Sequence, residues 1–168
     1  MKNKNIRPIK HADIPYVVDL LNTAYRGEMG WSNESEIVEG QRISPTQLTE
    51  YLEDSYFHLF VLEVEQHIVG CIGLTEHQNV IEIGTFAIQP SLQNQGFGRQ
   101  LLDYAERYAR EHCFLTVQMA VLNVRTELIS YYQRRGYIHT GRIETYPMHA
   151  NVGIPKVPLH LLVLEKPL

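Results

Sequence analysis

Two glycines stand where a strand-like run meets a helix-like run, in the segment Gln93-Asn94-Gln95-Gly96-Phe97-Gly98. The first turn of a helix has unpaired N–H groups and a partial positive charge, and glycine lets a ligand oxygen approach the backbone. Such a turn can bind a diphosphate without a lysine, although glycine there also has a purely structural use. The nucleoside-triphosphate loop is absent, and GxGxxG fails because Leu101 occupies its third glycine position. The pattern that remains is Q-x-x-G-x-G.

The elements that must position this turn follow from hydrophobic periodicity. Asp13 is suited to cap the first helix, and Ser44 with Gln47 forms a capping box for the second. The order of elements predicts an α/β (α+β) fold, with a central, mostly antiparallel mixed sheet of about seven strands flanked by about four helices. The predicted strands cover residues 6–9, 57–64, 68–76, 80–88, 114–122, 137–145 and 158–165, and the predicted helices cover residues 14–26, 44–52, 99–110 and 126–135.

Composition restricts the class of protein. The chain has 168 residues, of which 44% are hydrophobic and 20% charged, and its net charge is -4. These values indicate one domain over residues 1–168, and the negative charge argues against coating a nucleic acid. No signal peptide or membrane segment is visible, so we expect a cytoplasmic protein with Cys71 and Cys113 as free thiols. The eight histidines have no HxxxH or HExxH spacing, so we expect no metal.

The glycine turn resembles the coenzyme signature of the GNAT superfamily of N-acetyltransferases, Q/R-x-x-G-x-G/A at the start of a helix. A second motif, Tyr131-Tyr132-Gln133-Arg134-Arg135-Gly136-Tyr137, is similar to the family pattern Phe/Leu-Tyr-x-x-x-Gly-Phe. The order of predicted elements also matches the family over nearly the whole chain. The resemblance implies a GNAT-like fold and acetyl-CoA as cosubstrate.

The resemblance implies a set of coenzyme contacts. The backbone amides of residues 95–99 would bind the pyrophosphate of acetyl-CoA, and the strand ending at Ile88 would pair with the pantetheine arm. Asn123 resembles a family asparagine that contacts the coenzyme, but it stands nine residues before Tyr132 rather than the usual seven. The expected coenzyme-binding residues are Phe86, Ala87, Ile88, Gln93, Asn94, Gln95, Gly96, Phe97, Gly98, Arg99 and Asn123.

Acetyl transfer to an amine needs a base, because an alkyl amine with a pKa of about 10.4 is almost fully protonated at pH 7. Glu82 interrupts an apolar strand and matches the family's base position, so we expect it to act as the base, directly or through water. The alternative is that Glu82 is a solvated carboxylate or is paired with an arginine. Gly84 suggests a bulge that frees backbone N–H groups of residues 86–88 for the acyl oxygen, or a small residue beneath a helix. Tyr132 is the expected acid for the departing thiolate, with core packing as the alternative.

The acceptor is expected to be a primary amine of a small molecule or peptide. The segments that vary most in the family, here the first two helices with their loop and residues 146–158, are expected to recognise the substrate, with Tyr25, Glu28 and Trp31 as contacts. Glu28, Glu34, Glu36 and Glu39 suggest an acidic approach for a cationic amine, or a solvated face. A non-catalytic acyl-CoA-binding module is the alternative function, although it would not need both Glu82 and Tyr132. Pairing into a homodimer is an expectation by family analogy.

Overall fold

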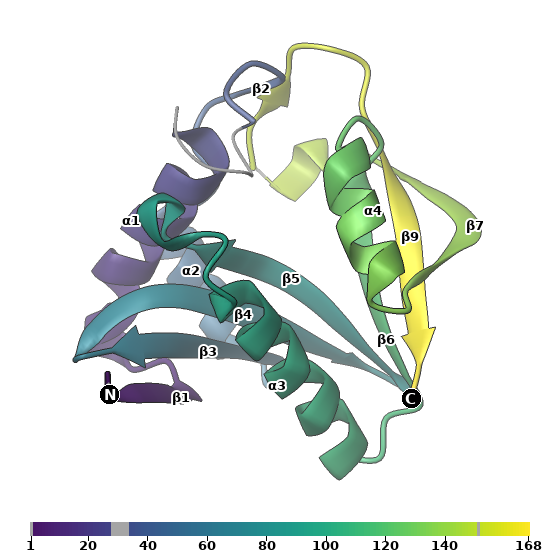
Figure 1. The fold of residues 1–168 in the computed structure, drawn as a ribbon. Coiled ribbons are helices and arrows are strands. Elements are labelled where there is room, and N and C mark those ends of the chain that lie inside the picture. Colours follow the sequence, from purple (N-terminus) through teal and green to yellow (C-terminus); the bar gives the residue numbers. More distant parts are fainter. Residues whose placement is uncertain (1, 28–33, 151) are drawn as a thin grey trace.

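The computed structural model describes residues 2–27, 34–150 and 152–168, and within them seven strands form one sheet in the order β1-β3-β4-β5-β6-β9-β7 (Figure 1). Neighbouring strands are antiparallel except β5 and β6, which are parallel. The predicted fold class is therefore confirmed. The strands are β1 Lys4–Pro8, β3 Phe57–Val64, β4 His67–His77, β5 Val80–Ile88, β6 Thr116–Leu122, β7 Ile138–Thr145 and β9 His160–Pro167.

The four α-helices of the described residues cover both faces of the sheet (Figure 1). One hydrophobic cluster contains buried residues of α1 and α2, and a second contains those of α3 and α4. The apolar stripe predicted for the first helix is buried, as at Val17 and Leu21. In these ranges no helix combines the length and apolar character needed to cross a membrane. The helices are α1 Ile14–Arg26, α2 Pro45–Glu53, α3 Phe97–Glu111 and α4 Thr126–Arg134.

The two predicted helix caps have different outcomes. Ser44 Oγ accepts a hydrogen bond from Gln47 N at 3.1 Å, and Ser44 N donates to Gln47 Oε1 at 2.8 Å, which confirms the capping box. Asp13 precedes α1, but its side chain makes no cap bond to that helix. It accepts instead from Lys10 N and Arg7 Nη1, each at 2.7 Å. The cap predicted at Asp13 is wrong because the guanidinium is a stronger partner than a helix amide.

A bulge in β5 changes which side chains face each layer. Gly73 pairs with Gly84 but Cys71 pairs with Ala87, so β5 contains one extra residue, and Thr85 there has a φ of 48°. The predicted bulge at Gly84 is confirmed, and a Cβ added at Gly84 would meet no atom within 4 Å, so no helix of the described residues packs on it. Because the extra residue reverses the alternation, Ala87 belongs to the cluster with α1 and α2.

The parallel strands β5 and β6 separate midway along their length. Their pairing runs from Val80 with Thr116 to Ile83 with Met119, and beyond that pair the strands diverge (Figure 1). A sheet that opens in this way leaves backbone groups and side chains of both strands available to a ligand. The site described below lies at this opening.

A second, two-stranded sheet was not predicted. It pairs β2 Val38–Glu39 with β8 Ile154–Pro155 in antiparallel register. Lys156 N also donates to Ile37 O at 2.8 Å. This ribbon joins the segment after α1 to the segment after β7, which are the two parts of the chain expected to recognise the substrate.

Candidate active site

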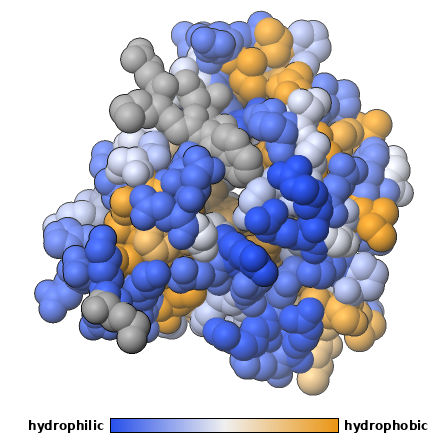
Figure 2. Space-filling view, in the orientation of Figure 1, coloured by the Kyte–Doolittle hydropathy of each residue, from blue (hydrophilic) through white to orange (hydrophobic). Residues whose placement is uncertain are grey.

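A first cleft of about 500 Å³ lies between the N-terminus of α3, the end of β5 and α4. Figure 2 shows a hollow in the middle of this face, bordered largely by hydrophilic residues. Most of the predicted coenzyme-binding residues lie together here. The cleft is lined by Tyr25, Glu34, Phe86, Ala87, Ile88, Leu92, Gln93, Asn94, Gly96, Phe97, Gly98, Arg99, Leu128, Tyr131, Tyr132, Arg134 and Arg135.

The start of α3 is open to a ligand. Gly96 has a φ of +84° and precedes the first helical residue, and no side chain in the described part of the chain caps the helix there. Phe97 is buried in the core and anchors the first turn. A Cβ added at Gly98 would lie 3.8 Å from both Ile88 Cγ1 and Phe86 Cζ, so the glycine keeps a narrow space open between α3 and β5. Backbone N–H groups at such a helix end favour anionic ligands.

A second cleft of about 330 Å³ lies where β5 and β6 diverge. Ile83, Gly84 and Thr85 line one side, and residues 119–122 of β6 line the other. Its remaining walls come from α1, α2, α4 and β9, from Glu34 and Arg42 on either side of β2, from Arg125 before α4, and from the segment after β7 that contains Tyr146 and Val152. The residues that line both clefts are Tyr25, Glu34, Phe86, Leu128 and Tyr132.

Tyr132 lies at this junction and is nearly enclosed. Its exposed fraction is 6%, and its ring makes edge contacts with Tyr131 and Tyr137. Burial raises the pKa of the Tyr132 hydroxyl well above its ordinary value, so the side chain is neutral at physiological pH. Tyr132 is therefore both a core residue and a wall of the site.

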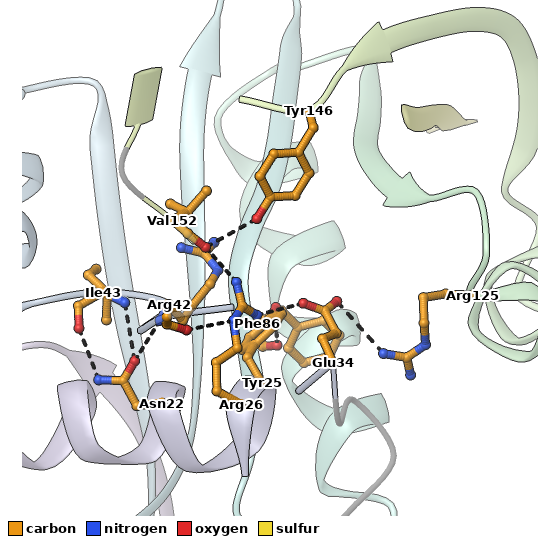
Figure 3. Close-up of polar contacts among 11 residues, drawn as sticks. Asn22, Tyr25, Arg26, Glu34, Arg42, Ile43, Phe86, Arg125, Tyr146 and Val152 are labelled. Carbon is orange, nitrogen blue, oxygen red and sulfur yellow. Dashed lines mark hydrogen bonds and ion pairs between the residues drawn. The ribbon is translucent and has the colours of Figure 1, made fainter. Parts of the chain in front are cut away.

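Tyr25, a predicted substrate contact, is held at the same junction. Its hydroxyl donates a hydrogen bond to Phe86 O at 2.8 Å, and burial raises its pKa. This bond joins α1 to the part of β5 that follows the bulge (Figure 3). Tyr25 thereby fixes the strand segment predicted to contact the pantetheine arm.

A buried ion cluster connects the walls of the second cleft (Figure 3). Glu34 accepts a hydrogen bond from Arg26 Nη1 at 2.7 Å, and Arg125 Nη1 lies 3.7 Å from its other oxygen. Desolvation raises the pKa of Glu34, and Arg26, Arg125 and Arg42 oppose that rise. Glu34 does not offer a free negative charge to attract a cationic amine, as its suggested role required, because two guanidinium groups neutralise its carboxylate. Sequence reasoning missed all three arginines.

Several predicted site residues lie elsewhere. Asn123 and Gln95 do not line the first cleft, and Asn123 Oδ1 accepts a hydrogen bond from His160 N at 3.1 Å. Glu82 lines neither cleft; its side chain is 43% exposed, and its carboxylate lies 3.5 Å from His77 Nε2. Glu28 and Trp31 lie outside the described residues. Among described residues, no group of three or more His, Cys, Asp or Glu side chains is arranged to hold a metal ion.

Comparisons with known proteins point to one family. A sequence model of the Acetyltransferase (GNAT) family matches residues 16–137. The chain is 27% identical over 103 residues to the uncharacterized protein YxbD of Bacillus subtilis (strain 168), a match that covers 59% of this chain and 61% of that relative. It therefore spans less than two thirds of that relative's length.

Solved structures show the same fold. The ribosomal-protein-S18-alanine N-acetyltransferase of Escherichia coli superimposes with a TM-score of 0.76 at 16% identity, covering 98% of this chain and 94% of that one. A GNAT family acetyltransferase from Elizabethkingia anophelis, with acetyl-CoA bound, superimposes with a TM-score of 0.72 at 24% identity, covering 99% of each chain.

Proposed function

Because the chain belongs to the GNAT family of acetyltransferases, we propose that it transfers an acetyl group from acetyl-CoA to a primary amine of a small molecule or a peptide. The observation that carries this proposal is the meeting of two clefts at Tyr132, Tyr25 and Phe86. A thioester in the first cleft and an amine in the second would be adjacent at that junction. Such an arrangement favours direct transfer within one ternary complex.

The first cleft fits the coenzyme. The uncapped N-terminus of α3, with Gly96 and Gly98, would hold the pyrophosphate through backbone N–H groups. Arg99, Arg134 and Arg135 line the same cleft and would add positive charge near the phosphates. The coenzyme would supply an activated acetyl thioester, and residues 86–88 would direct it toward the junction and donate N–H groups to the acyl oxygen.

Tyr132 would donate a hydrogen bond to the sulfur as negative charge develops on it. A thiol ordinarily has a pKa of about 8.5, whereas the buried phenol of Tyr132 has a pKa above its ordinary 10.0. The phenol is therefore protonated both before and after the step, and its main contribution would be to stabilise the thiolate. The proton that finally neutralises the sulfur would come from the acceptor nitrogen, with the Tyr132 hydroxyl giving its own proton to the sulfur as it takes up the one from nitrogen.

Glu82 would act on the amine through water. Gly84 lies two residues farther along β5 and lines the second cleft. Residues two apart on a strand face the same side, at a spacing of about 7 Å. Because the Glu82 side chain lies outside the cleft but on the same face of β5 as Gly84, a water can bridge its carboxylate to an amine beside Gly84. This placement supports the water-mediated form of the role predicted for Glu82.

Two measurements test the proposed function. Isothermal titration calorimetry with acetyl-CoA measures coenzyme binding, and a thiol-reactive dye measures release of free coenzyme A with a panel of amines, amino acids, polyamines and peptides. We expect saturable binding of acetyl-CoA and amine-dependent thiol release. Absence of coenzyme binding would contradict the proposal, and binding without release for every amine would favour the non-catalytic acyl-CoA-binding module.

A further inference from the structure

The charge in the second cleft is opposite in sign to the net charge of the protein. Among its described lining residues, the charged side chains are three arginines, Arg26, Arg42 and Arg125, and one carboxylate, Glu34. The whole chain has a net charge of -4. A local excess of positive charge in an acidic protein indicates a site that attracts an anionic group.

Arg26 and Arg125 already have partners. Both contact the carboxylate of Glu34, at 2.7 Å and 3.7 Å respectively. Arg26 also donates to the carbonyl oxygens of Gly40 and Val152, and Arg125 Nε donates to Glu127 at 2.9 Å. These two side chains therefore brace the wall of the cleft.

Arg42 differs from both. In residues 2–27, 34–150 and 152–168, no carboxylate lies within ion-pair distance of its guanidinium group. That group lies over the ring of Tyr25, 5.2 Å from the centroid, and Tyr25 borders both clefts. The backbone at this point is fixed, because the N–H groups of Arg42 and Ile43 donate to Asn22 Oδ1 at 2.8 Å and 3.2 Å (Figure 3). A positioned guanidinium without a carboxylate partner is a ready site for an anion.

We propose that the acceptor amine carries a carboxylate or phosphate group, and that Arg42 binds this group in the second cleft. The inference rests on the proposed function and names its substrate class. The rest of the acceptor would be apolar, since Ile83, Leu122 and Leu128 also line the cleft.

This charge arrangement also suits the reaction. Positive charge near an amine favours its neutral form, which is the nucleophile, and therefore lowers the pKa of a bound ammonium group. A cationic acceptor without an anionic group would be repelled by the same arginines. The anionic group of the acceptor would compensate for that repulsion and orient the amine.

The test compares product-like ligands that differ only in their charged group. Calorimetry on the protein loaded with coenzyme A would use N-acetyl-leucine against N-acetyl-leucinamide, and N-acetyl-phosphoethanolamine against N-acetylethanolamine. We expect the anionic member of at least one pair to bind about 10- to 100-fold more tightly. The pair that shows the difference identifies the anion as carboxylate or phosphate. In Arg42→Gln the ratio should fall to within about threefold of unity.

Arg107→Gln is the matched control, because Arg107 lies on α3, is 63% exposed and lines neither cleft. It should keep the ratio of the wild-type protein. The inference is overturned if neither anionic ligand binds, if neutral partners bind equally tightly, or if the preference survives in Arg42→Gln. Failure of the proposed function has a different signature, namely no binding of acetyl-CoA or no thiol release with any amine.

Discussion

Substitution of the two glycines at the start of α3 should separate coenzyme binding from stability. A Cβ at Gly98 would meet Ile88, Phe86 and Tyr131 at 3.8 to 3.9 Å, which is ordinary van der Waals contact. Gly98→Ala should therefore fold without strain, and alanine is favoured over glycine in a helix by about 0.5–1 kcal/mol. Gly96 has a φ of +84° with no atom near the position of an added Cβ, so the cost of Gly96→Ala is backbone strain of about 1–2 kcal/mol.

Gly98→Ala should weaken coenzyme binding, although it should not weaken the stability of the free protein. Its added methyl group would occupy the space between α3 and β5 in which the pyrophosphate and pantetheine arm are proposed to lie. Loss of one hydrogen bond to a charged oxygen costs about 1.5–3 kcal/mol, which corresponds to about 10- to 100-fold weaker binding of acetyl-CoA. Thus Gly98→Ala should weaken the coenzyme complex without destabilising the free protein.

Two assays measure these effects. Thermal unfolding of the free protein should show Gly98→Ala at or above the wild-type Tm, and Gly96→Ala lower by about 2–8 °C. Calorimetry with acetyl-CoA should show the large loss of affinity in Gly98→Ala. Wild-type affinity in Gly98→Ala would refute the argument that the first cleft holds the coenzyme against the start of α3.

Three further predictions concern catalysis and acid stability. Tyr132→Phe should lower kcat about 100-fold, measured by thiol release, and change the acetyl-CoA Kd less than about twofold, measured by calorimetry. An unchanged kcat would show that Tyr132 has no part in the mechanism. Glu82→Gln should shift the pH at which kcat/KM rises to a higher value. His77→Gln, which removes only the imidazole ring beside Glu82, should not shift it. Identical pH profiles for the wild-type protein and both variants would exclude Glu82 as the base. The Arg7 guanidinium lowers the pKa of Asp13 below its ordinary 3.8, so the stability from this pair is present above that pH and is lost as the pH falls through the folded-state pKa. In urea titrations Asp13→Asn should therefore cost about 1–3 kcal/mol at pH 7 and progressively less as the pH falls through the folded-state pKa, and an equal cost at neutral and at acid pH would contradict the ion-pair explanation.

Local patterns were sufficient for most elements of the fold. The capping box at Ser44 and the bulge beside Gly84 both depend on backbone geometry within a few residues. Asp13 shows the limit of such reasoning. Asp13 is a residue type that often caps helices, but its carboxylate pairs with Arg7 of β1 rather than with the first amides of α1. A local sequence pattern does not show which partner the folded chain brings close to a side chain.

The sequence by itself determined the turn and the helix that border the first cleft, the proposed coenzyme site, since Gln93 to Gly98 and Tyr132 lie in short local motifs. Only the tertiary structure decided the second cleft, the proposed acceptor site. Arg26 and Glu34 are close in the sequence, but Arg125 lies far from both, between β6 and α4, and the three meet where β5 and β6 diverge beyond Ile83 and Met119. Long-range register of this kind depends on the summed packing of the whole sheet, and no local spacing encodes it. The same packing leaves Arg42 facing the second cleft without a carboxylate of its own among the described residues.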